Sequence, residues 1–398
     1  MKDIFTIYKP KGPTSYDMIA QVKKATGESR VGHAGTLDPL AEGVLVVGVG
    51  RDATRQLEGV VKKEKEYIAD IKLGVTSETD DEEGIKTKTK NVKSVKLSEV
   101  KEVIEKFIGI VDQVPPIYSA IKVSGQRAYK AARKGQELKL APRKVEIKSI
   151  KILKYKYPNL KIRVITGRGV YIRSLARDIG KALGTGGYMS DLKRERVGKF
   201  KASKAIDINR LSDKYLKRRI KILRNRGIGV IPTDTIYGLV GMAVDNNTVE
   251  RIYKVRKRQP DKPFIILISS ISDLKKFGVV VDDKTKNILK KYWPGKISII
   301  LPCSSKLKYL HRGTNTLAFR LPSDLQLLQL LNKTGPLVAP SANLEGKKPA
   351  ITIKQAKKYF GDQVDFYFDQ GKYESESSTL IKIENGEIIT LRNGAVKI

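Results

Sequence analysis

The sequence predicts an α/β (α+β) protein that consists of two successive domains. Its 398 residues exceed the size of most single domains. Short apolar segments that are typical of strands alternate with helical segments along the chain. Between Leu211 and Arg226 the composition changes to a strongly basic helical stretch. We therefore expect one domain over residues 1–213 and a second over residues 214–398.

The first domain begins with an expected strand over 4–8, which ends before Pro10 and Gly12. Thr14 is a suitable N-cap for the helix that follows, and Gly27 is a suitable stop for it. Further strands are expected at 43–50, at 65–73 and within 145–165, and a further helix at 98–109.

The second domain shows short apolar strands with helical segments between them, which is the alternation of an α/β domain. The expected strands are 227–235, 263–269, 296–303, 316–322 and 336–343. The expected helices are 247–255, 285–293, 324–333 and 352–360. Near the end of the chain, Asn385-Gly386 between two strand-like runs predicts a hairpin turn.

The charge of the chain is strongly positive, at +36. Residues 1–213 hold 44 Lys+Arg against 26 Asp+Glu, and the remainder holds 34 against 16, so each half is near +18. A basic excess in both halves favours polyanion partners, with RNA as the first candidate. The alternative is a lysine-rich surface that is merely solvated.

The other bulk features exclude several classes of protein. Cys303 is the single cysteine, so the chain can form neither an internal disulfide nor a cysteine-based zinc site. The first residues lack the apolar core of a signal peptide, and no stretch reaches the roughly 18 apolar residues of a membrane span. We therefore expect a cytoplasmic protein that does not bind membranes.

The first candidate site lies in the segment VGHAGTLDPLAEGVL. Asp38 stands in a glycine-dense loop before Pro39, where backbone can approach a ligand closely, and His33 precedes it by five residues. Taken alone, an aspartate before proline is usually a turn residue, and a lone histidine is usually structural. The acidic run 78–83 does not have EF-hand spacing, and we interpret it as structural.

Five further segments accompany this loop, namely YKPKGPTS, KEYIADIKLG, VPPIYSAIKVSGQRAYKAAR, GVYIRSLARDIG and LKRERVGKF. In content and order they resemble the motifs of the TruB family of tRNA pseudouridine synthases. The resemblance covers residues 7–200 and implies a mixed-sheet catalytic domain that isomerises the T-loop uridine, position 55 of tRNA. The RNA-binding PUA-type module that usually ends this family is not visible after residue 213.

The resemblance also implies roles for individual residues. Asp38 would be the catalytic aspartate, Tyr67 would stack on the target uracil, and Arg173 would pair with Asp38. The remaining residues would contact RNA. His33 would take the place in the T-loop base stack that the flipped nucleotide had occupied, and Lys9, Tyr171 and Leu192 would lie at the pocket or its rim. Two simpler interpretations stay open, a core position for Tyr67 and an exposed phosphate-binding role for Arg173.

The chemistry of pseudouridine formation agrees with such a site. The N1–C1′ bond breaks, the uracil turns, and a C5–C1′ bond forms, so no cofactor and no metal is needed. An ionised carboxylate is required, whether it attacks the sugar, attacks the base or removes a proton. A guanidinium beside Asp38 would keep the pKa of that carboxyl low, and a ring at Tyr67 would offset part of the stacking lost when the base flips.

The second candidate site begins where a buried strand ends, at Thr233, Thr235 and Tyr237, a usual place for ligands in α/β folds. The segment KVRKRQPDKP then places five cations between Lys254 and Lys262. Arg256 and Arg258 cannot share a helix face, but the prolines that follow indicate that the helix ends, so we expect both to converge on an anion. The alternative is a solvated charge run.

With Ser341 and Asn343 of PSAN, these segments resemble the YrdC family, whose signature is K-x-R followed far downstream by S-x-N. The segments WPGKISIIL, AFRLP, STLIKI and LRNGAV also match its pattern, so the resemblance covers about residues 214–396. It implies a twisted α/β domain that makes threonylcarbamoyl-AMP from L-threonine, bicarbonate and ATP, with Mg²⁺. A separate threonylcarbamoyl transferase complex would then complete N6-threonylcarbamoyladenosine in tRNA. Arg256 replaces the usual lysine and Gln259 the usual proline.

This second resemblance also implies three groups of ligand-binding residues. Cationic side chains would bind the phosphates and the carbamate, hydroxyl groups would bind threonine, and further residues would bind the nucleotide. The residues in the three groups are Arg256, Arg258, Lys262, Arg320, Thr233, Thr235, Tyr237, Ser341, Asn343 and Arg392. The sequence thus predicts a bifunctional tRNA-modification enzyme. One alternative makes the second half an RNA-binding module in place of the missing PUA domain. Another makes both halves scaffolds, which the intact GTLDP around Asp38 disfavours.

Overall fold

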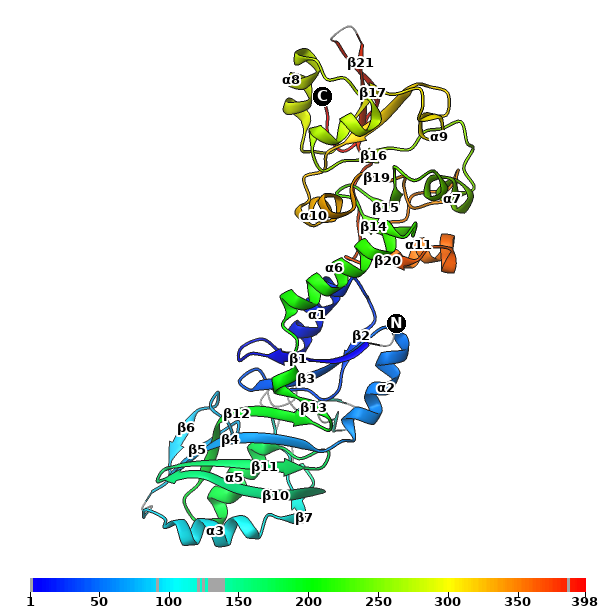
Figure 1. The fold of residues 1–398 in the computed structure, drawn as a ribbon. Coiled ribbons are helices and arrows are strands. Elements are labelled where there is room, and N and C mark those ends of the chain that lie inside the picture. The colour runs from blue at the N-terminus through cyan, green and yellow to red at the C-terminus, as the bar shows by residue number, and fades with distance from the viewer. Residues whose placement is uncertain (1–2, 91–92, 120–121, 124–125, 128–139, 385–386) are drawn as a thin grey trace. The chain divides into compact units, whose positions relative to one another are not determined.

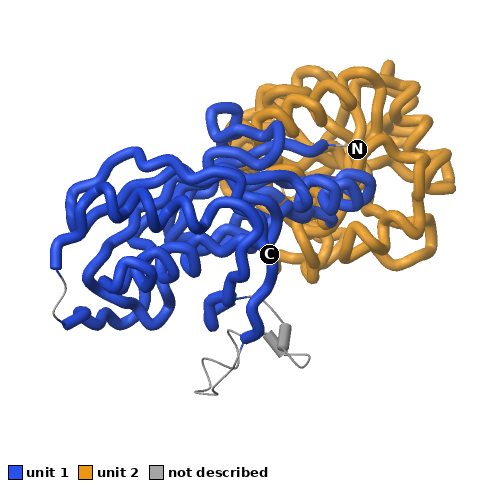
Figure 2. The backbone as a smooth tube through the Cα atoms, turned by 90° about the horizontal axis from the view of Figure 1, so that it is seen from below, with its two compact units in different colours: residues 1–22, 30–208 blue, residues 23–29, 209–398 orange. Residues whose placement is uncertain are grey.

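The computed structural model describes the whole chain except residues 1–2, 91–92, 120–121, 124–125, 128–139 and 385–386. The chain forms two compact units. Unit 1 contains residues 1–22 and 30–208, and unit 2 contains residues 23–29 and 209–398 (Figure 2). Helix α6 (Ile208–Arg224) begins where the residues of unit 1 end, and it also contains position 213, where the sequence analysis places the domain boundary.

Unit 1 is built on a nine-stranded sheet (Figure 1). In spatial order its main path is β1 (Asp3–Lys9), β3 (Glu42–Val49), β12 (Gly187–Val197), β4 (Lys65–Leu73), β11 (Asn159–Thr166), β10 (Arg143–Lys156) and β7 (Gly109–Gln113). The short strands β2 (Val31–His33) and β13 (Phe200–Lys201) pair with β3 and β12. Strand β12 runs parallel to β3 and antiparallel to β4, so the sheet is mixed.

Among its described residues, unit 1 has the α-helices α1 (Ser15–Thr26), whose last residues belong to unit 2, α2 (Arg51–Val61), α3 (Leu97–Glu105) and α5 (Ile172–Ala182). The predicted helix 98–109 is too long at its end, because Gly109 has φ 107° and begins strand β7 instead. Helix α5 packs on β12 and β4, and its apolar face joins a core with alternate residues of β4 and β11.

Unit 2 is built on a second nine-stranded mixed sheet. Its order is β20 (Phe366–Tyr367), β14 (Gly229–Pro232), β15 (Tyr237–Met242), β19 (Leu337–Val338), β16 (Ile266–Leu267), β18 (Thr316–Arg320), β17 (Ile297–Pro302), β21 (Thr379–Glu384) and β22 (Glu387–Arg392). The sheet contains parallel pairs, such as β14 with β20, and antiparallel pairs, such as β14 with β15. The two mixed sheets, each with its helices, confirm the predicted α/β fold class.

The helices of unit 2 are α6, α7 (Asn246–Arg256), α8 (Asp283–Tyr292), α9 (Lys308–His311), α10 (Leu325–Thr334) and α11 (Ile353–Phe360). Four of them start at side-chain caps that accept a backbone N–H, namely Asp245, Asp282, Asp324 and Thr352. Such caps satisfy donors that the first helical turn leaves free. These short polar residues explain why the expected helices lie within a few residues of the observed ones.

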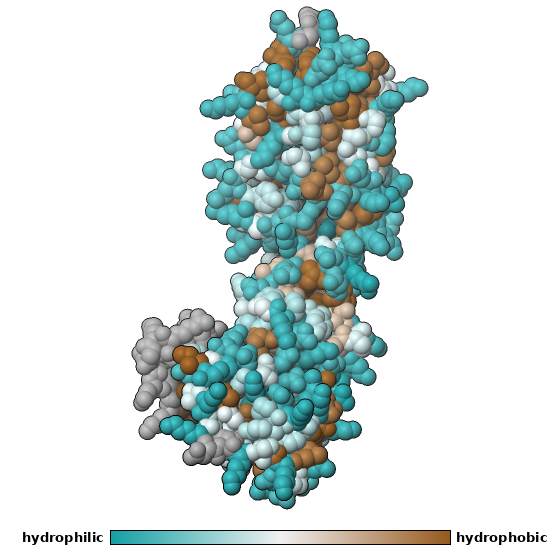
Figure 3. All heavy atoms as spheres, turned by 90° about the vertical axis from the view of Figure 1, so that its left-hand side faces the viewer, coloured by the Kyte–Doolittle hydropathy of each residue, from teal (hydrophilic) through white to brown (hydrophobic). Residues whose placement is uncertain are grey.

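Two further expectations concern the end of the chain and membranes. The predicted turn Asn385-Gly386 lies outside the described residues, but β21 and β22 on either side of it pair antiparallel, with Glu384 opposite Glu387. On the face drawn in Figure 3, hydrophilic side chains predominate on the surface of both units. Among the described residues, no helix is both long enough and apolar enough to cross a membrane.

Candidate active sites

Asp38 lies in the loop between β2 and β3, and the backbone of this loop is tied to the body of unit 1. Buried Lys9 donates its Nζ hydrogens to the carbonyl oxygens of Pro10, Pro39 and Ala41, at 2.8, 3.2 and 2.7 Å. Burial lowers the pKa of Lys9 to about 8, although the charge of Asp38 opposes this shift. The candidate pocket residue Lys9 therefore acts on the loop backbone directly.

Two more side chains hold the same loop. The Oγ of Ser15 accepts from the N–H of Leu37 and donates to its carbonyl, both at 2.9 Å. Arg194, which is buried, donates from Nε to the Val44 carbonyl at 2.8 Å and from Nη2 to the Gly35 carbonyl at 3.1 Å. The sequence analysis did not identify either residue as part of the site, although both lie inside segments that carried the resemblance.

The carboxylate of Asp38 lies beside a buried guanidinium. Its Oδ2 is 3.0 Å from Nη2 of Arg173, and the Arg173 side chain is 8% exposed while that of Asp38 is 35% exposed. Nη1 of Arg173 also lies 3.2 Å from Oδ2 of Asp81, whose side chain is 4% exposed. Arg173 further donates to the carbonyl oxygen of Tyr118 at 3.1 Å. The Arg173 guanidinium is thus shared by two carboxylates. Of these two, Asp38 is accessible to solvent, whereas Asp81 is buried.

The second carboxylate comes from the acidic run that the sequence analysis interpreted as structural. Asp81 binds Arg173, and its neighbour Asp80 lies 2.7 Å from Arg177, one turn further along α5. Burial raises the pKa of Asp80, and Arg177 counteracts that shift. The signal that could have identified these partners is the i, i+4 spacing of the two arginines, matched by two adjacent aspartates.

The remaining predicted residues of unit 1 form walls around this loop. Tyr67 on β4 and Leu192 on β12 are buried in one apolar cluster with Leu37. The backbone of Tyr171 exchanges two hydrogen bonds with the side chain of Gln113, at 2.8 and 3.1 Å, just before α5 begins. Burial raises the pKa of the Tyr171 hydroxyl, which therefore stays neutral. Part of VPPIYSAIKVSGQRAYKAAR lies outside the described residues.

His33 ends strand β2 and precedes the Asp38 loop. Burial and the nearby charge of Arg194 both lower the pKa of His33, against a smaller opposite effect of a backbone hydrogen bond. The imidazole is therefore neutral near pH 7, because the lowered pKa lies below an ordinary value of about 6.5. A neutral ring suits stacking on a base.

Unit 2 contains a cavity of about 440 Å³, within the range of small-molecule sites. Six of the predicted ligand-binding residues line it, namely Thr233, Thr235, Arg258, Arg320, Ser341 and Arg392. Hydroxyl side chains that the sequence analysis missed also line it, namely Thr314, Thr316, Ser377 and Ser378. The combination of guanidinium groups and hydroxyls suits an anionic, hydrogen-bonding ligand.

Arg320 and Asp234 fix the loop after β14 that carries two of these hydroxyls. Nη2 of Arg320 is 3.1 Å from Oδ1 of Asp234 and donates to the Thr233 carbonyl at 2.8 Å. Burial lowers the pKa of Arg320, and Asp234 counteracts this shift. Asp234 has φ 63°, a left-handed conformation that turns its side chain away from those of its threonine neighbours.

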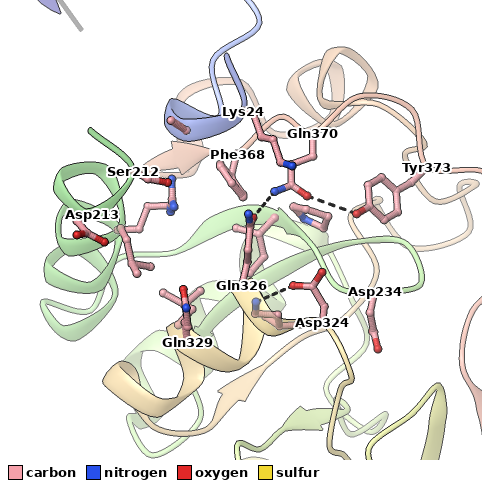
Figure 4. A pocket seen from close by; sticks show the side chains of 17 residues that line it. Lys24, Ser212, Asp213, Asp234, Asp324, Gln326, Gln329, Phe368, Gln370 and Tyr373 are labelled. Carbon is pink, nitrogen blue, oxygen red and sulfur yellow. Dashed lines mark hydrogen bonds between the residues drawn. The ribbon is translucent and has the colours of Figure 1, made fainter. Parts of the chain in front are cut away.

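Because its backbone is left-handed, Asp234 lines a different cavity from its threonine neighbours. A smaller cavity of about 80 Å³ in unit 2 has Asp234 on its wall together with Asp324, Gln370 and Tyr373 (Figure 4). The amide of Gln370 donates to Oε1 of Gln326 at 2.6 Å, and its oxygen accepts from the Tyr373 hydroxyl at 3.5 Å. Gln326, Gln370 and Tyr373 are thus bonded to one another, and this cavity is much smaller than the first, so the larger cavity is the better candidate for a ligand.

Arg256 and Arg258 take different positions at the cavity: Arg258 lines it, whereas Arg256 lies behind it and bonds Ser341 of the lining. Helix α7 ends at Arg256, and Lys257 then adopts φ 52°, which turns the chain. Arg256 is 1% exposed and donates to the carbonyl and Oδ1 of Asn343, at 2.9 and 3.1 Å, and to Oγ of Ser341 at 3.3 Å. Burial and the charge of Arg258 lower the pKa of Arg256 to about 10, so it stays a cation near pH 7. Arg258 instead lines the cavity.

Three further predicted residues lie beside the cavity without lining it. Lys262 is 3.2 Å from Oε1 of Glu345, a residue that the sequence analysis missed. The amide of Asn343 donates to two carbonyl oxygens of its own loop, at 2.9 and 2.7 Å. The hydroxyl of Tyr237 donates to the Gly371 carbonyl at 2.8 Å. No group of three or more potential metal ligands occurs within the described part of the chain.

Comparisons with known proteins agree with both halves. A model of the TruB family pseudouridylate synthase N-terminal domain matches residues 23–172, and a model of the tRNA pseudouridylate synthase B C-terminal domain matches residues 173–226. The Sua5, YciO and YrdC model, described as "Telomere recombination", matches residues 221–394.

Two curated relatives and one solved structure illustrate what the chain is similar to. The chain is 37% identical over 301 residues to tRNA pseudouridine synthase B of Francisella tularensis, a match that covers 75% of this chain and 97% of that relative. It is 39% identical over 253 residues to tRNA pseudouridine synthase B of Clostridium kluyveri, covering 63% and 83%. Among solved structures, P. abyssi Sua5 complexed with L-threonine is 28% identical and covers 46% of this chain and 54% of its own, with a TM-score of 0.44.

The chain therefore belongs to the TruB family of pseudouridine synthases, and it joins this unit in one polypeptide to a unit of the Sua5, YciO and YrdC family.

Proposed function

We propose that unit 1 isomerises the T-loop uridine of tRNA, position 55, to pseudouridine. The observation that carries this proposal is the half-exposed carboxylate of Asp38, 3.0 Å from buried Arg173, in a loop whose backbone is held by Lys9, Ser15 and Arg194. A site that is fixed before substrate arrives loses little freedom when it reacts. Tyr67 and Leu192 form the apolar wall against which a flipped uracil would stack.

Each residue has a task in this reaction. Asp38, which lies 3.0 Å from Arg173, supplies the carboxylate that attacks the sugar, attacks the base or removes a proton. The N1–C1′ bond breaks, the uracil turns, the C5–C1′ bond forms, and the proton lost from C5 is balanced by the one gained at N1. Arg173 is held on its far side by Asp81, so it cannot swing toward substrate phosphate. No cofactor enters this scheme.

We assign to unit 2 the formation of threonylcarbamoyl-AMP from L-threonine, bicarbonate and ATP. The carbamate of threonine would attack the α-phosphorus of ATP and expel pyrophosphate, a reaction that needs positioning and charge neutralisation. Arg258, Arg320 and Arg392 line the cavity and are the cations available to such a ligand, while Thr233, Thr235 and Ser341 offer hydroxyls. Mg²⁺ would arrive on the phosphate oxygens of ATP.

One observation favours a second candidate for unit 2, an RNA-binding role without synthesis. Two of the three cations expected at the phosphates are engaged elsewhere, Arg256 with Asn343 and Lys262 with Glu345. If these contacts persist when ATP is present, only the three arginines that line the cavity, Arg258, Arg320 and Arg392, would remain for the phosphates. Pyrophosphate release that requires both threonine and bicarbonate would support the synthase, and an absence of ATP binding would support the RNA-binding role.

The experiment for unit 1 uses the full chain and an unmodified tRNA transcript. Modified positions are mapped by carbodiimide treatment and primer extension. We expect one pseudouridine, at the T-loop uridine, and a product at another position or no product would contradict the proposal.

A further inference from the structure

Helix α6 carries a straight row of cations on one face. Arg210, Lys214, Lys217, Lys221 and Arg224 recur at intervals of four and three residues, which places them above one another along the helix. All five are exposed. At 1.5 Å per residue the row is about 21 Å long. We call these five residues the α6 row.

The opposite face of α6 is fixed in the protein. Leu211, Tyr215 and Leu223 are buried. Leu216 and Ile220 pack on an apolar cluster of unit 2, and Arg219 lies over the ring of Phe368 at 4.0 Å. Because this face is buried, the helix cannot rotate, and the α6 row points permanently to solvent.

The α6 row has one acidic neighbour inside its helix, exposed Asp213, which lies three residues after Arg210 and four residues before Lys217. Within the part of the chain that the structure describes, none of the five lies within ion-pair distance of a carboxylate. Like charges three or four residues apart on a helix repel each other and destabilise it. The repulsion in four successive pairs therefore lowers the stability of the free protein. A line of negative charges bound along the α6 row would remove this repulsion.

Helix α8 provides the contrast. Its exposed lysines fall in two pairs on different faces, Lys286 with Lys290 and Lys284 with Lys291, and two aspartates, Asp282 and Asp283, lie at its start. High lysine content alone therefore does not produce a row like that of α6.

We propose that the α6 row binds the phosphate backbone of the tRNA substrate. This inference rests on the proposed function of unit 1, since tRNA is the polyanion that the chain must hold. Regularly spaced Lys and Arg suit a sugar-phosphate backbone, and such contacts position RNA without reading its bases. A membrane surface fits poorly, because an interfacial helix inserts an exposed apolar face, and that of α6 is buried.

The test compares two triple variants of the full chain that remove equal charge. One is Lys214→Gln/Lys217→Gln/Lys221→Gln in α6, and the matched control is Lys284→Gln/Lys286→Gln/Lys290→Gln in α8. Glutamine keeps helix propensity close to that of lysine, and circular dichroism and melting temperature verify folding. Binding of a tRNA transcript is measured by fluorescence anisotropy at several salt concentrations.

For the α6 variant we expect at least a roughly tenfold weaker affinity. The slope of log affinity against log salt should fall by about 1 for each phosphate that the variant no longer neutralises. Its KM for pseudouridine formation should rise while kcat at saturating tRNA is kept. The α8 control should keep affinity and slope.

Equal reductions in affinity for both variants, or no reduction for either, would overturn the proposal. An α6 variant impaired only in binding anionic phosphatidylserine vesicles would overturn it as well. A wild-type chain that binds tRNA but forms no pseudouridine would instead refute the function of unit 1.

Discussion

Arg173 determines how charge is distributed at the candidate site of unit 1. It contacts Asp38 and Asp81 together, so the three groups carry one net negative charge when all are ionised. Asp38 is the more exposed of the two carboxylates and is therefore the one that substrate can reach. Its partner Asp81 is a positioning residue, because it acts through the guanidinium.

Replacing Asp38 by asparagine should abolish pseudouridine formation, because an amide cannot supply the negative charge that the reaction requires. Binding of tRNA should stay within a few fold of wild type, since phosphate contacts far from the base dominate affinity. A tritium-release assay on tRNA labelled at uridine C5 and a filter-binding titration measure the two quantities. Turnover near that of wild type would remove Asp38 from the mechanism.

Replacing Asp81 by asparagine should lower kcat on the order of 100-fold, or about 2.7 kcal/mol in the barrier. Without Asp81, Arg173 would no longer be held in its position beside Asp38. The matched control is Asp80→Asn, which removes the partner of Arg177 and should change kcat only a few fold. Single-turnover kinetics at saturating tRNA measures both, with melting temperatures to correct for folding. A similar kcat for the two variants would show that Asp81 is structural.

At the scale of elements, the end of helix α7 separates two neighbouring arginines. Arg256 bonds the S-x-N segment, whereas Arg258 lines the cavity. The sequence correctly predicts that the helix ends here. It does not predict the left-handed Lys257, and this residue decides where each side chain points.

Arg256→Lys and Arg258→Ala should therefore fail in different ways. A lysine at position 256 cannot reproduce the three hydrogen bonds that the planar guanidinium of Arg256 donates. The free energy of unfolding of unit 2 should therefore fall by about 1–3 kcal/mol. Alanine at 258 should leave stability nearly unchanged but reduce threonine-dependent pyrophosphate release on the order of 100-fold, because a cation at the cavity would be absent when charge moves onto the leaving group. Urea unfolding and a coupled pyrophosphate assay measure the two effects. Equal stability losses in both variants would contradict this separation.

The loop around Asp38 could be predicted because its motif is continuous in sequence. The partners that fix the loop could not, since Arg194 and Asp81 meet it only through strand pairing and the approach of α5. Helices could be predicted where the capping residue and the apolar residues lie close together in the sequence, as in the helices that follow Asp282 and Asp324. The parallel pairing of β12 with β3 depends on contacts distant in sequence, and no local pattern indicates it.

At the scale of the whole molecule, each unit has a separate hydrophobic core, one around Ile71 and Leu175 and one around Val230 and Phe319. The Asp38 site draws all its described partners from unit 1, and the large cavity is lined entirely by unit 2. A substitution at one site should therefore leave the chemistry of the other intact.

The measurement that tests this account most directly is pyrophosphate release from ATP by the wild-type chain and by Asp38→Asn. Each protein is assayed with threonine and bicarbonate together, with either alone and with neither. We predict equal release by both proteins, only when both co-substrates are present, while Asp38→Asn forms no pseudouridine. Release that is indifferent to threonine, or that disappears with Asp38→Asn, would contradict the claim that one chain carries two independent active sites.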